Sequence, residues 1–321
     1  MDEIRQAPRI AVIGGINIDI TATAQSKMIP GDSNPGDCNI SFGGVGRNIA
    51  ETLSRLGADV SLVTALGQDA HTESIRHSCE HAGIDLTHSR VIPDEINGLY
   101  VCLNDVSGDL YAAVSDMRIC ERITPEFLLP SLAYLCACDL VVVDANLPET
   151  TLQWLAQYVT APIAADPVSI RKAGRLKSCL YAIRLLKPNR PEAELLTGVS
   201  IRGTHGLEEA AAGLHGSGVD SVFISLGSQG VFYSDHTAHG LIPAFNEMPF
   251  STNGCGDAMF AAICISYIRG LSARDCAKAG QAAAAICAQS ANAVSDAMSP
   301  QKLEQELNWM NRQYEWRNSD E

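Results

Sequence analysis

Apolar residues along this chain gather in short runs that alternate with segments of helical spacing. The runs at 9–13, 60–66, 140–143, 163–165, 183–186 and 222–225 predict buried strands. The spacing of apolar positions over 45–56, 70–81, 150–158 and 206–215 predicts helices between them. Strands that alternate with helices favour a mostly parallel sheet covered by helices on both faces. We therefore expect an α/β fold.

Two regions depart from this alternation, at about 16–42 and 96–115. Polar and apolar residues alternate there, interrupted by Gly, Asn and Pro, and helical spacing is absent. We interpret both regions as extra strands that project from the main sheet and serve as a lid or as a dimerisation sheet. The stretch 301–316 predicts an amphipathic helix with a packing role. The whole chain, 1–321, is expected to be a single domain.

Composition narrows the possible partners. Apolar residues make up 46% of the chain, which is enough for a large core. The formal net charge of −14 argues against nucleic acid, because phosphate backbones are bound by clustered Lys and Arg. It does not exclude a nucleotide, whose phosphates backbone amides and Mg²⁺ can hold.

The chain also lacks the signals of a membrane or secreted protein. Residues 1–8 contain no apolar run of signal-peptide length. The longest apolar stretches, such as 258–268, are too short to cross a bilayer. Eleven cysteines are scattered without the paired spacing of a zinc site, which favours buried, reduced thiols. We expect a cytoplasmic protein without a membrane partner.

The residues with the clearest chemistry are 251–257 (STNGCGD), directly before the apolar run of a predicted helix. The first turn of a helix has free N–H groups and a positive dipole end, so three amides here would stabilise a developing anion. The carboxylate of Asp257 can take a proton from a hydroxyl. Transfer of a phosphoryl group to an alcohol needs both. The alternative for Asp257 is an ordinary N-terminal helix residue.

The chain lacks the other common phosphate-binding motifs. The chain contains no G-x-x-x-x-G-K-[ST], and the glycines at 44–46 and 254–256 lack the third glycine of a dinucleotide fingerprint. Four segments, at 43–48 (GGVGRN), 187–192 (KPNRPE), 225–230 (SLGSQG) and 253–257 (NGCGD), instead resemble the ribokinase or PfkB family of carbohydrate and nucleoside kinases. The resemblance implies a ribokinase-like three-layer α/β/α sandwich with a mostly parallel central sheet and a small β-strand lid. It also implies ATP and Mg²⁺ as cofactors.

The same resemblance assigns the catalytic turn. It implies that Asp257 is the general base and that the amides of Gly254, Cys255 and Gly256 form the anion hole. This chain departs from the family twice, with Ser251 where relatives usually have Asp and Cys255 where they usually have Ala. The usual Asp lies near a monovalent-cation site, so Ser251 weakens the expectation that K⁺ is required.

The resemblance places further residues at the nucleotide. It implies that Lys187 and Asn189 lie at the ATP phosphates and that Glu192 with Asn189 organises Mg²⁺, largely through water. The alternative for the pair Asn189 and Glu192 is a capping box at a helix start, and both readings can hold together. Nucleotide contacts are also expected from a small set of residues, namely Ser225, Gly227, Gly230 and Asn292. For residues 225–230 a plain hairpin is the competing interpretation.

The sugar site of the family corresponds here to Asn17, Asp19, Gly43, Gly44 and Asn48. A carboxylate can accept hydrogen bonds from vicinal hydroxyls, and an amide can donate and accept. Alone, Asp19 would be read as a residue of a turn at a strand end. The neighbouring Arg47 is left open between steering an anion and ordinary solvation.

Segments 32–36, 115–117 and 166–169 resemble one bacterial nucleoside kinase of the family more closely. The resemblance implies phosphorylation of a nucleoside 5′-hydroxyl by ATP in a homodimer joined through the lid. A kinase of another nucleoside or sugar is the near alternative. A non-catalytic nucleoside-binding protein is the alternative from a different class, and the presence of Asp257 and Glu192 argues against it.

Overall fold

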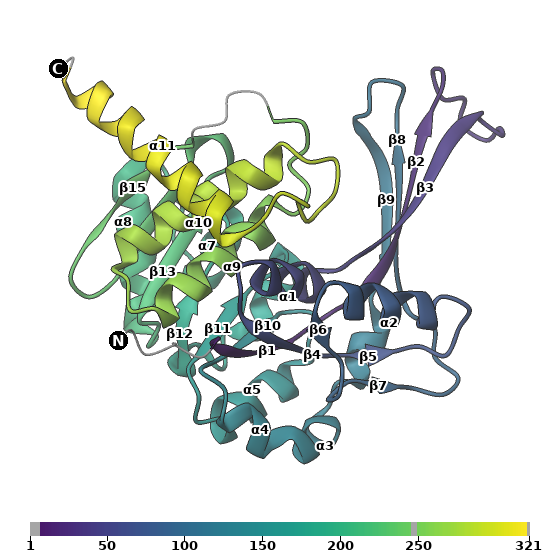
Figure 1. Ribbon diagram of the computed structural model, residues 1–321, viewed down its shortest axis with the longest axis horizontal. Coiled ribbons are helices and arrows are strands. Elements are labelled where there is room, and N and C mark those ends of the chain that lie inside the picture. Colours follow the sequence, from purple (N-terminus) through teal and green to yellow (C-terminus); the bar gives the residue numbers. More distant parts are fainter. Residues whose placement is uncertain (1–6, 245–248, 320–321) are drawn as a thin grey trace.

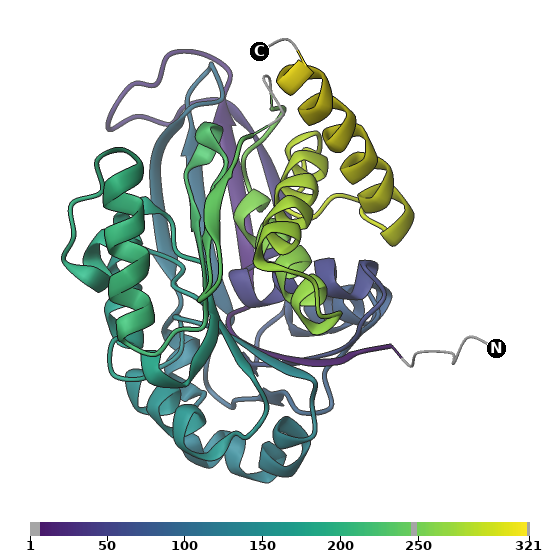
Figure 2. The same cartoon turned by 90° about the vertical axis from the view of Figure 1, so that its left-hand side faces the viewer.

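A computed structural model describes residues 7–244 and 249–319 of the protein. Residues 1–6, on which the expected lack of a signal sequence rests, lie outside this range. The architecture is a twisted sheet with helices on both faces and a second, separate sheet at one end (Figures 1 and 2). The expected α/β sandwich with a mostly parallel central sheet is confirmed.

The main sheet has nine strands. In spatial order these are β15 (His239–Ile242), β14 (Val231–Ser234), β13 (Ser221–Ser225), β12 (Ile183–Leu186), β11 (Ile163–Asp166), β10 (Leu140–Asp144), β1 (Arg9–Ile13), β4 (Asp59–Val63) and β6 (Ile84–Asp85). Neighbours from β13 to β6 are parallel, whereas β14 and β15 continue the sheet as antiparallel strands. The strands are short and apolar because both faces are covered.

Alternate residues of the strands enter two hydrophobic clusters, one on each face of the sheet. Ile10 and Val12 of β1 belong to one cluster, and Ala11 and Ile13 belong to the other. The first cluster is covered by α1 (Val45–Arg55), α2 (Thr72–His81), α9 (Cys255–Ile268), α10 (Ala273–Ala288) and α11 (Pro300–Ser319). The second is covered by α3 (Pro125–Leu128), α4 (Leu132–Cys136), α5 (Glu149–Tyr158), α6 (Ile170–Ala173), α7 (Arg190–Thr197) and α8 (Gly203–Gly216).

Four strands stand apart from the main sheet (Figure 1). In spatial order they are β3 (Gly36–Gly43), β2 (Asn17–Ala24), β8 (Gly98–Asn104) and β9 (Leu110–Asp116). They fall within the two regions in which polar and apolar residues alternate. Strand β2 follows β1 and β3 precedes α1, so the chain leaves the main sheet and returns to it beside the start of α1.

The predicted strand at 60–66 is divided. Its first part is β4, and its last two residues form β5 (Ala65–Leu66), which pairs with β7 (Arg90–Val91) in a separate two-stranded sheet.

The predicted helix at the C-terminal end is α11, and its side chains Leu303 and Met310 are buried against the first cluster. No described helix has the length and apolarity needed to cross a membrane.

Candidate active site

A cavity of about 1140 Å³ lies between the four-stranded sheet, α1 and the loops next to α9 and α10. Of the residues predicted for the site, those that line it are Asn17, Asp19, Gly44, Asn48, Asp257 and Asn292. They come from positions far apart in the sequence, on β2, α1, α9 and the loop after α10. Gly43 adjoins them at the end of β3, and the other predicted residues do not line the cavity.

Asp257 lies in the first turn of α9, and its side chain is half-buried at the cavity wall. Its Oδ2 accepts a hydrogen bond of 2.8 Å from Nδ2 of Asn48. Burial, reinforced by the negative charge of Asp166, raises the pKa of the Asp257 carboxyl to about 7, against the opposing effects of Asn48 and Lys187. Such a carboxyl exchanges a proton readily near neutral pH.

Lys187 supplies the positive charge next to this carboxyl. Its Nζ forms an ion pair of 3.0 Å with Oδ2 of Asp166, and both side chains are buried. A Cβ on Gly256 would lie 3.4 Å from the same Nζ, so the ammonium adjoins the glycine turn. Burial alone would lower the pKa of Lys187, but Asp166, Asp257 and Glu192 outweigh it and raise that pKa.

The turn before α9 requires glycine at its N-cap. Gly254 has a φ of +74°, and a Cβ there would overlap the carbonyl oxygen of Ala293. The expectation of three free amides is wrong for one of them, because the N–H of Cys255 donates to the carbonyl oxygen of Thr252 at 3.4 Å. The turn folds back on itself there and so satisfies a group that a helix start would otherwise leave unpaired.

The predicted sugar residues are preassembled at the base of the four-stranded sheet. Nδ2 of Asn17 donates to Oδ1 of Asp19 at 2.5 Å. Burial raises the pKa of the Asp19 carboxyl, while the bond from Asn17 and the charge of Arg47 oppose that rise. A Cβ on Gly43 would overlap the Asp19 carboxylate, which explains a glycine at this position.

Asn189 and Glu192 form the capping box that the sequence allowed. The backbone N–H of Asn189 donates to Oε2 of Glu192 at 2.8 Å, and the N–H of Glu192 donates to Oδ1 of Asn189 at 2.9 Å. Burial raises the pKa of the Glu192 carboxyl. These bonds fix the direction of the carboxylate and are compatible with a metal role, since Mg²⁺ takes one or two carboxylates and keeps several waters.

The segments predicted to contact the nucleotide lie next to one another. Asn189 pairs with Ser225 in an isolated β-bridge, and the N–H of Ser225 donates to the carbonyl oxygen of Pro188 at 2.9 Å. Gly227 and Gly230 lie in the connection between the antiparallel strands β13 and β14, so the hairpin interpretation of this segment is correct as geometry. Asn292 lies in the loop after α10 and lines the cavity.

Sequence reasoning missed Asp144, the last residue of β10. Its buried carboxylate accepts hydrogen bonds from the N–H groups of Gly15 at 2.8 Å and Gly46 at 3.0 Å. It also accepts one of 2.9 Å from the N–H of Asn146. Asp144 therefore ties the end of β1 to the first turn of α1. An aspartate after an apolar run is the one local signal that could have indicated it.

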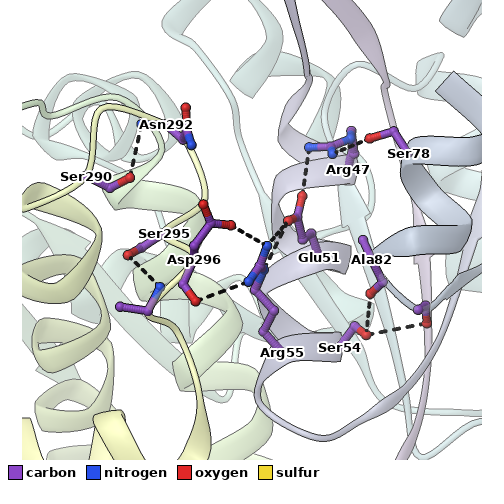
Figure 3. A network of polar contacts seen from close by, with 12 residues as sticks. Arg47, Glu51, Ser54, Arg55, Ser78, Ala82, Ser290, Asn292, Ser295 and Asp296 are labelled. Atoms are coloured by element: carbon purple, nitrogen blue, oxygen red, sulfur yellow. Dashed lines mark hydrogen bonds and ion pairs between the residues drawn. The ribbon is translucent and has the colours of Figure 1, made fainter. Parts of the chain in front are cut away.

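A second missed feature is a chain of charges from α1 to the loop after α10 (Figure 3). Arg47 pairs with Glu51 at 2.9 Å, Glu51 with Arg55 at 2.9 Å, and Arg55 with Asp296 at 2.8 Å. Arg47 also donates to Oγ of Ser78 at 3.0 Å. Arg47 is thus buried and ion-paired, not solvated, and the network connects the helix that carries Asn48 with the loop that carries Asn292.

Together, fold and site define an α/β protein with a half-buried carboxylate at a helix N-terminus on the wall of a large cavity, which is an arrangement suited to phosphoryl transfer. The profile described as pfkB family carbohydrate kinase matches residues 7–300. The chain belongs to the pfkB family of carbohydrate kinases. It is a sugar or nucleoside kinase of this family.

Individual relatives agree with this assignment. The pseudouridine kinase of Escherichia coli (strain K12) is 32% identical over 84% of this chain and 86% of its own. An uncharacterised sugar kinase of the same strain is also 32% identical, over 86% of this chain and 76% of its own.

Solved structures agree as well. A carbohydrate kinase from Agrobacterium tumefaciens superposes with a TM-score of 0.82 at 30% identity, covering 94% of this chain and 97% of its own. The ribokinase of Arabidopsis thaliana, solved with ribose and ATP, superposes with a TM-score of 0.83 at 22% identity over 94% and 99% of the two chains, and shows that the fold is ribokinase-like.

The charge network predicts unequal costs for two conservative substitutions. Glu51→Gln removes the buried counter-charge of Arg47, and we expect it to lower the free energy of unfolding by about 3–5 kcal/mol. The matched change Asp296→Asn breaks the exposed end of the same network and is expected to cost at most about 1 kcal/mol. Urea unfolding of both variants measures the difference. Equal costs would contradict the assignment of Glu51 as the buried anchor.

Proposed function

We propose that this protein transfers the γ-phosphoryl group of ATP to the 5′-hydroxyl of pseudouridine, giving pseudouridine 5′-phosphate and ADP. The phosphoryl-transfer chemistry is supported by one observation: the Asp257 carboxylate at the cavity wall, which accepts a hydrogen bond from Asn48. The choice of acceptor is supported by the identity to the pseudouridine kinase of E. coli.

In this proposal Asp257 takes the proton of the acceptor hydroxyl as the phosphoryl group arrives. The amide of Asn48 orients that carboxylate. In the turn formed by Gly254, Cys255 and Gly256, the N–H groups of Gly254 and Gly256 would lie where negative charge develops, since that of Cys255 is bonded to Thr252. The ammonium of Lys187 adds a fixed positive charge beside the turn. None of these groups has to reorganise during the reaction, which makes their stabilisation effective.

The acceptor and the nucleotide would occupy opposite walls of the same region. Asn17, Asp19, Gly43 and Gly44 would receive the ribose hydroxyls, because Asp19 can accept two hydrogen bonds. Nucleotide contacts are proposed for Ser225, Gly227, Gly230 and Asn292. The residues that would hold Mg²⁺, partly through water, are Asn189 and Glu192, and the ion when bound would neutralise phosphate charge.

The four-stranded sheet is proposed to act as a lid and as a dimerisation surface for a second copy of the chain. Exposed apolar side chains support the second role, among them Ile40, Leu110, Tyr111 and Val114, of which Val114 is 70% exposed. Closure of the sheet over the acceptor would exclude water and limit hydrolysis of ATP.

A kinase of another sugar or nucleoside is the second candidate. The specific observation that favours it is the equal identity to the uncharacterised sugar kinase of E. coli.

The first test is a comparison of acceptors. Purified protein with ATP and Mg²⁺ receives pseudouridine, uridine or ribose, and product is identified by mass together with release of ADP. We expect kcat/KM for pseudouridine to exceed that for the others by at least about tenfold, equivalent to about 1.4 kcal/mol of discrimination. Preference for uridine or ribose would retain a kinase and reject this acceptor.

Replacing the proposed base tests the chemistry. We expect Asp257→Asn to lower kcat by about 10²–10⁴, since that is the usual contribution of general-base assistance. The control Glu304→Gln alters an exposed carboxylate on α11, away from the cavity lining, and is expected to leave kcat unchanged.

The pH dependence of the unaltered enzyme provides a second measure of the same group. Because the pKa of Asp257 is about 7, kcat/KM is expected to fall about tenfold per pH unit below about 7 and to level off above it. In Asp257→Asn this dependence should disappear. Near-normal turnover in that variant would remove Asp257 from the mechanism.

The sugar contact is tested by Asp19→Ala. Loss of the carboxylate removes two hydrogen bonds to the ribose, each worth about 1.5–3 kcal/mol when one partner is charged, so KM for the acceptor should rise at least about tenfold. The KM for ATP should not change. A normal acceptor KM in a folded protein would place the ribose elsewhere.

A further inference from the structure

Two thiols meet behind the turn that precedes Asp257. Cys255 is the first residue of α9, and Cys287 lies one residue before the end of α10. Their sulfurs contact carbonyl groups of the same short turn, residues 251–253. Cys255 is half-buried, whereas Cys287 is fully buried. The pair therefore has one sulfur within reach of a small solute and one protected sulfur behind it.

The same pair is tied to both loops that border the cavity at this end. Sγ of Cys287 lies 3.5 Å from the carbonyl oxygen of Asn253 and 3.3 Å from that of Ala293. Sγ of Cys255 lies 3.7 Å from the carbonyl oxygen of Ser251. A bond between the two sulfurs would therefore act directly on the glycine turn and on the loop that carries Asn292.

The two sulfurs also differ in reactivity. The hydrogen bond from Cys287 lowers the pKa of the Cys255 thiol against the effect of burial, and its own N–H adds to that lowering. The bond to Cys255, together with burial, raises the pKa of Cys287. Burial likewise raises the pKa of other cysteines, such as Cys264 and Cys276. A thiolate is the form that attacks an oxidant, so Cys255 is the nucleophile of the pair.

We propose that Cys255 and Cys287 form a peroxide-sensitive modification site whose conversion to a disulfide distorts the glycine turn and stops phosphoryl transfer. The effect on transfer rests on the function proposed above, whereas formation of the disulfide does not.

Formation of the disulfide is a balanced reaction when a peroxide is the oxidant. The Cys255 thiolate attacks hydrogen peroxide, an S–O bond forms, the O–O bond breaks, and hydroxide leaves. The Cys287 sulfur then attacks the resulting sulfenic acid, the S–S bond forms, the S–O bond breaks, and the oxygen leaves as water with the proton of Cys287. In total two thiols and one peroxide give one disulfide and two waters, so sulfur is oxidised and oxygen is reduced.

The structural consequence follows from bond length. A disulfide holds its sulfurs about 2.05 Å apart, closer than two thiols in van der Waals contact, so forming it pulls the start of α9 and the end of α10 toward each other. Cys255 begins α9 only two residues before Asp257. A displacement of about 1 Å in a catalytic group commonly costs about 100-fold in rate.

The experiment treats the purified full-length protein with hydrogen peroxide and reads two quantities. Intact mass and peptide mapping should show loss of two hydrogens and a Cys255–Cys287 crosslink. Phosphoryl transfer to the best acceptor should fall about 100-fold and return with dithiothreitol. The mass measurement is valid even if pseudouridine is not that acceptor, so failure of the two proposals can be told apart.

Three variants complete the test. Cys287 does not line the cavity. Before treatment, Cys287→Ala is therefore expected to be as active as the unaltered protein, and after treatment it should show no loss of two hydrogens. Cys287→Ser replaces it if the alanine variant does not fold. Cys136→Ser removes a partly exposed thiol of α4 that does not line the cavity, and this variant should remain as sensitive as the unaltered protein. Reversible inactivation of Cys287→Ala with the same loss of mass would overturn the proposal, as would a crosslinked protein that keeps full activity.

Discussion

A carboxylate removed from water is tolerated only when hydrogen-bond donors surround it, and Asp144 meets this condition at the point where β1, β10 and α1 converge. The donors are the backbone N–H groups of Gly15, Gly46 and Asn146, so the chain itself must bend around the charge. Because Gly46 is in the first turn of α1, the negative charge also complements the positive end of that helix. The position of Asn48, and through it that of the Asp257 carboxylate, follows from this anchor.

Electrostatics at the other side of the site depends on one buried cation. Lys187 lies among Asp166, Asp257 and Glu192 in a protein of net charge −14. The ion pair lets β11 end in Asp166, and lets Lys187 follow β12, inside the fold. The remaining carboxylates keep raised pKa values, since a single ammonium cannot offset the burial of all of them.

Hydrophobic periodicity was sufficient to predict most of the framework, because strands such as β1 and β10 are buried on both faces and read as continuous apolar runs. It did not predict features that depend on contacts between residues far apart in the sequence. The division between β4 and β5 depends on pairing with β7, and the bond between Asn48 and Asp257 joins residues that are 209 positions apart. Only the family resemblance indicated that these two belong together.

The sequence pattern did not indicate the buried charges either, because local spacing does not identify them. An Asp at the end of a strand, such as Asp144 or Asp166, has no spacing that distinguishes it from a turn residue. The chain of ion pairs on α1 has helical spacing at 47, 51 and 55, and that signal was available. Its connection to Asp296 depends on the path of the loop after α10, which no local pattern describes.

The separation of the two sheets has a consequence for how this protein can change over evolutionary time. Residues of β3 and β9 are largely exposed, so most substitutions there cost little stability, and several of them nevertheless line the cavity. Residues of α9 behind Asp257 are almost all buried, and changes there disturb the core. Acceptor preference can therefore drift in one part of the chain while the machinery for transfer is held constant by packing in another.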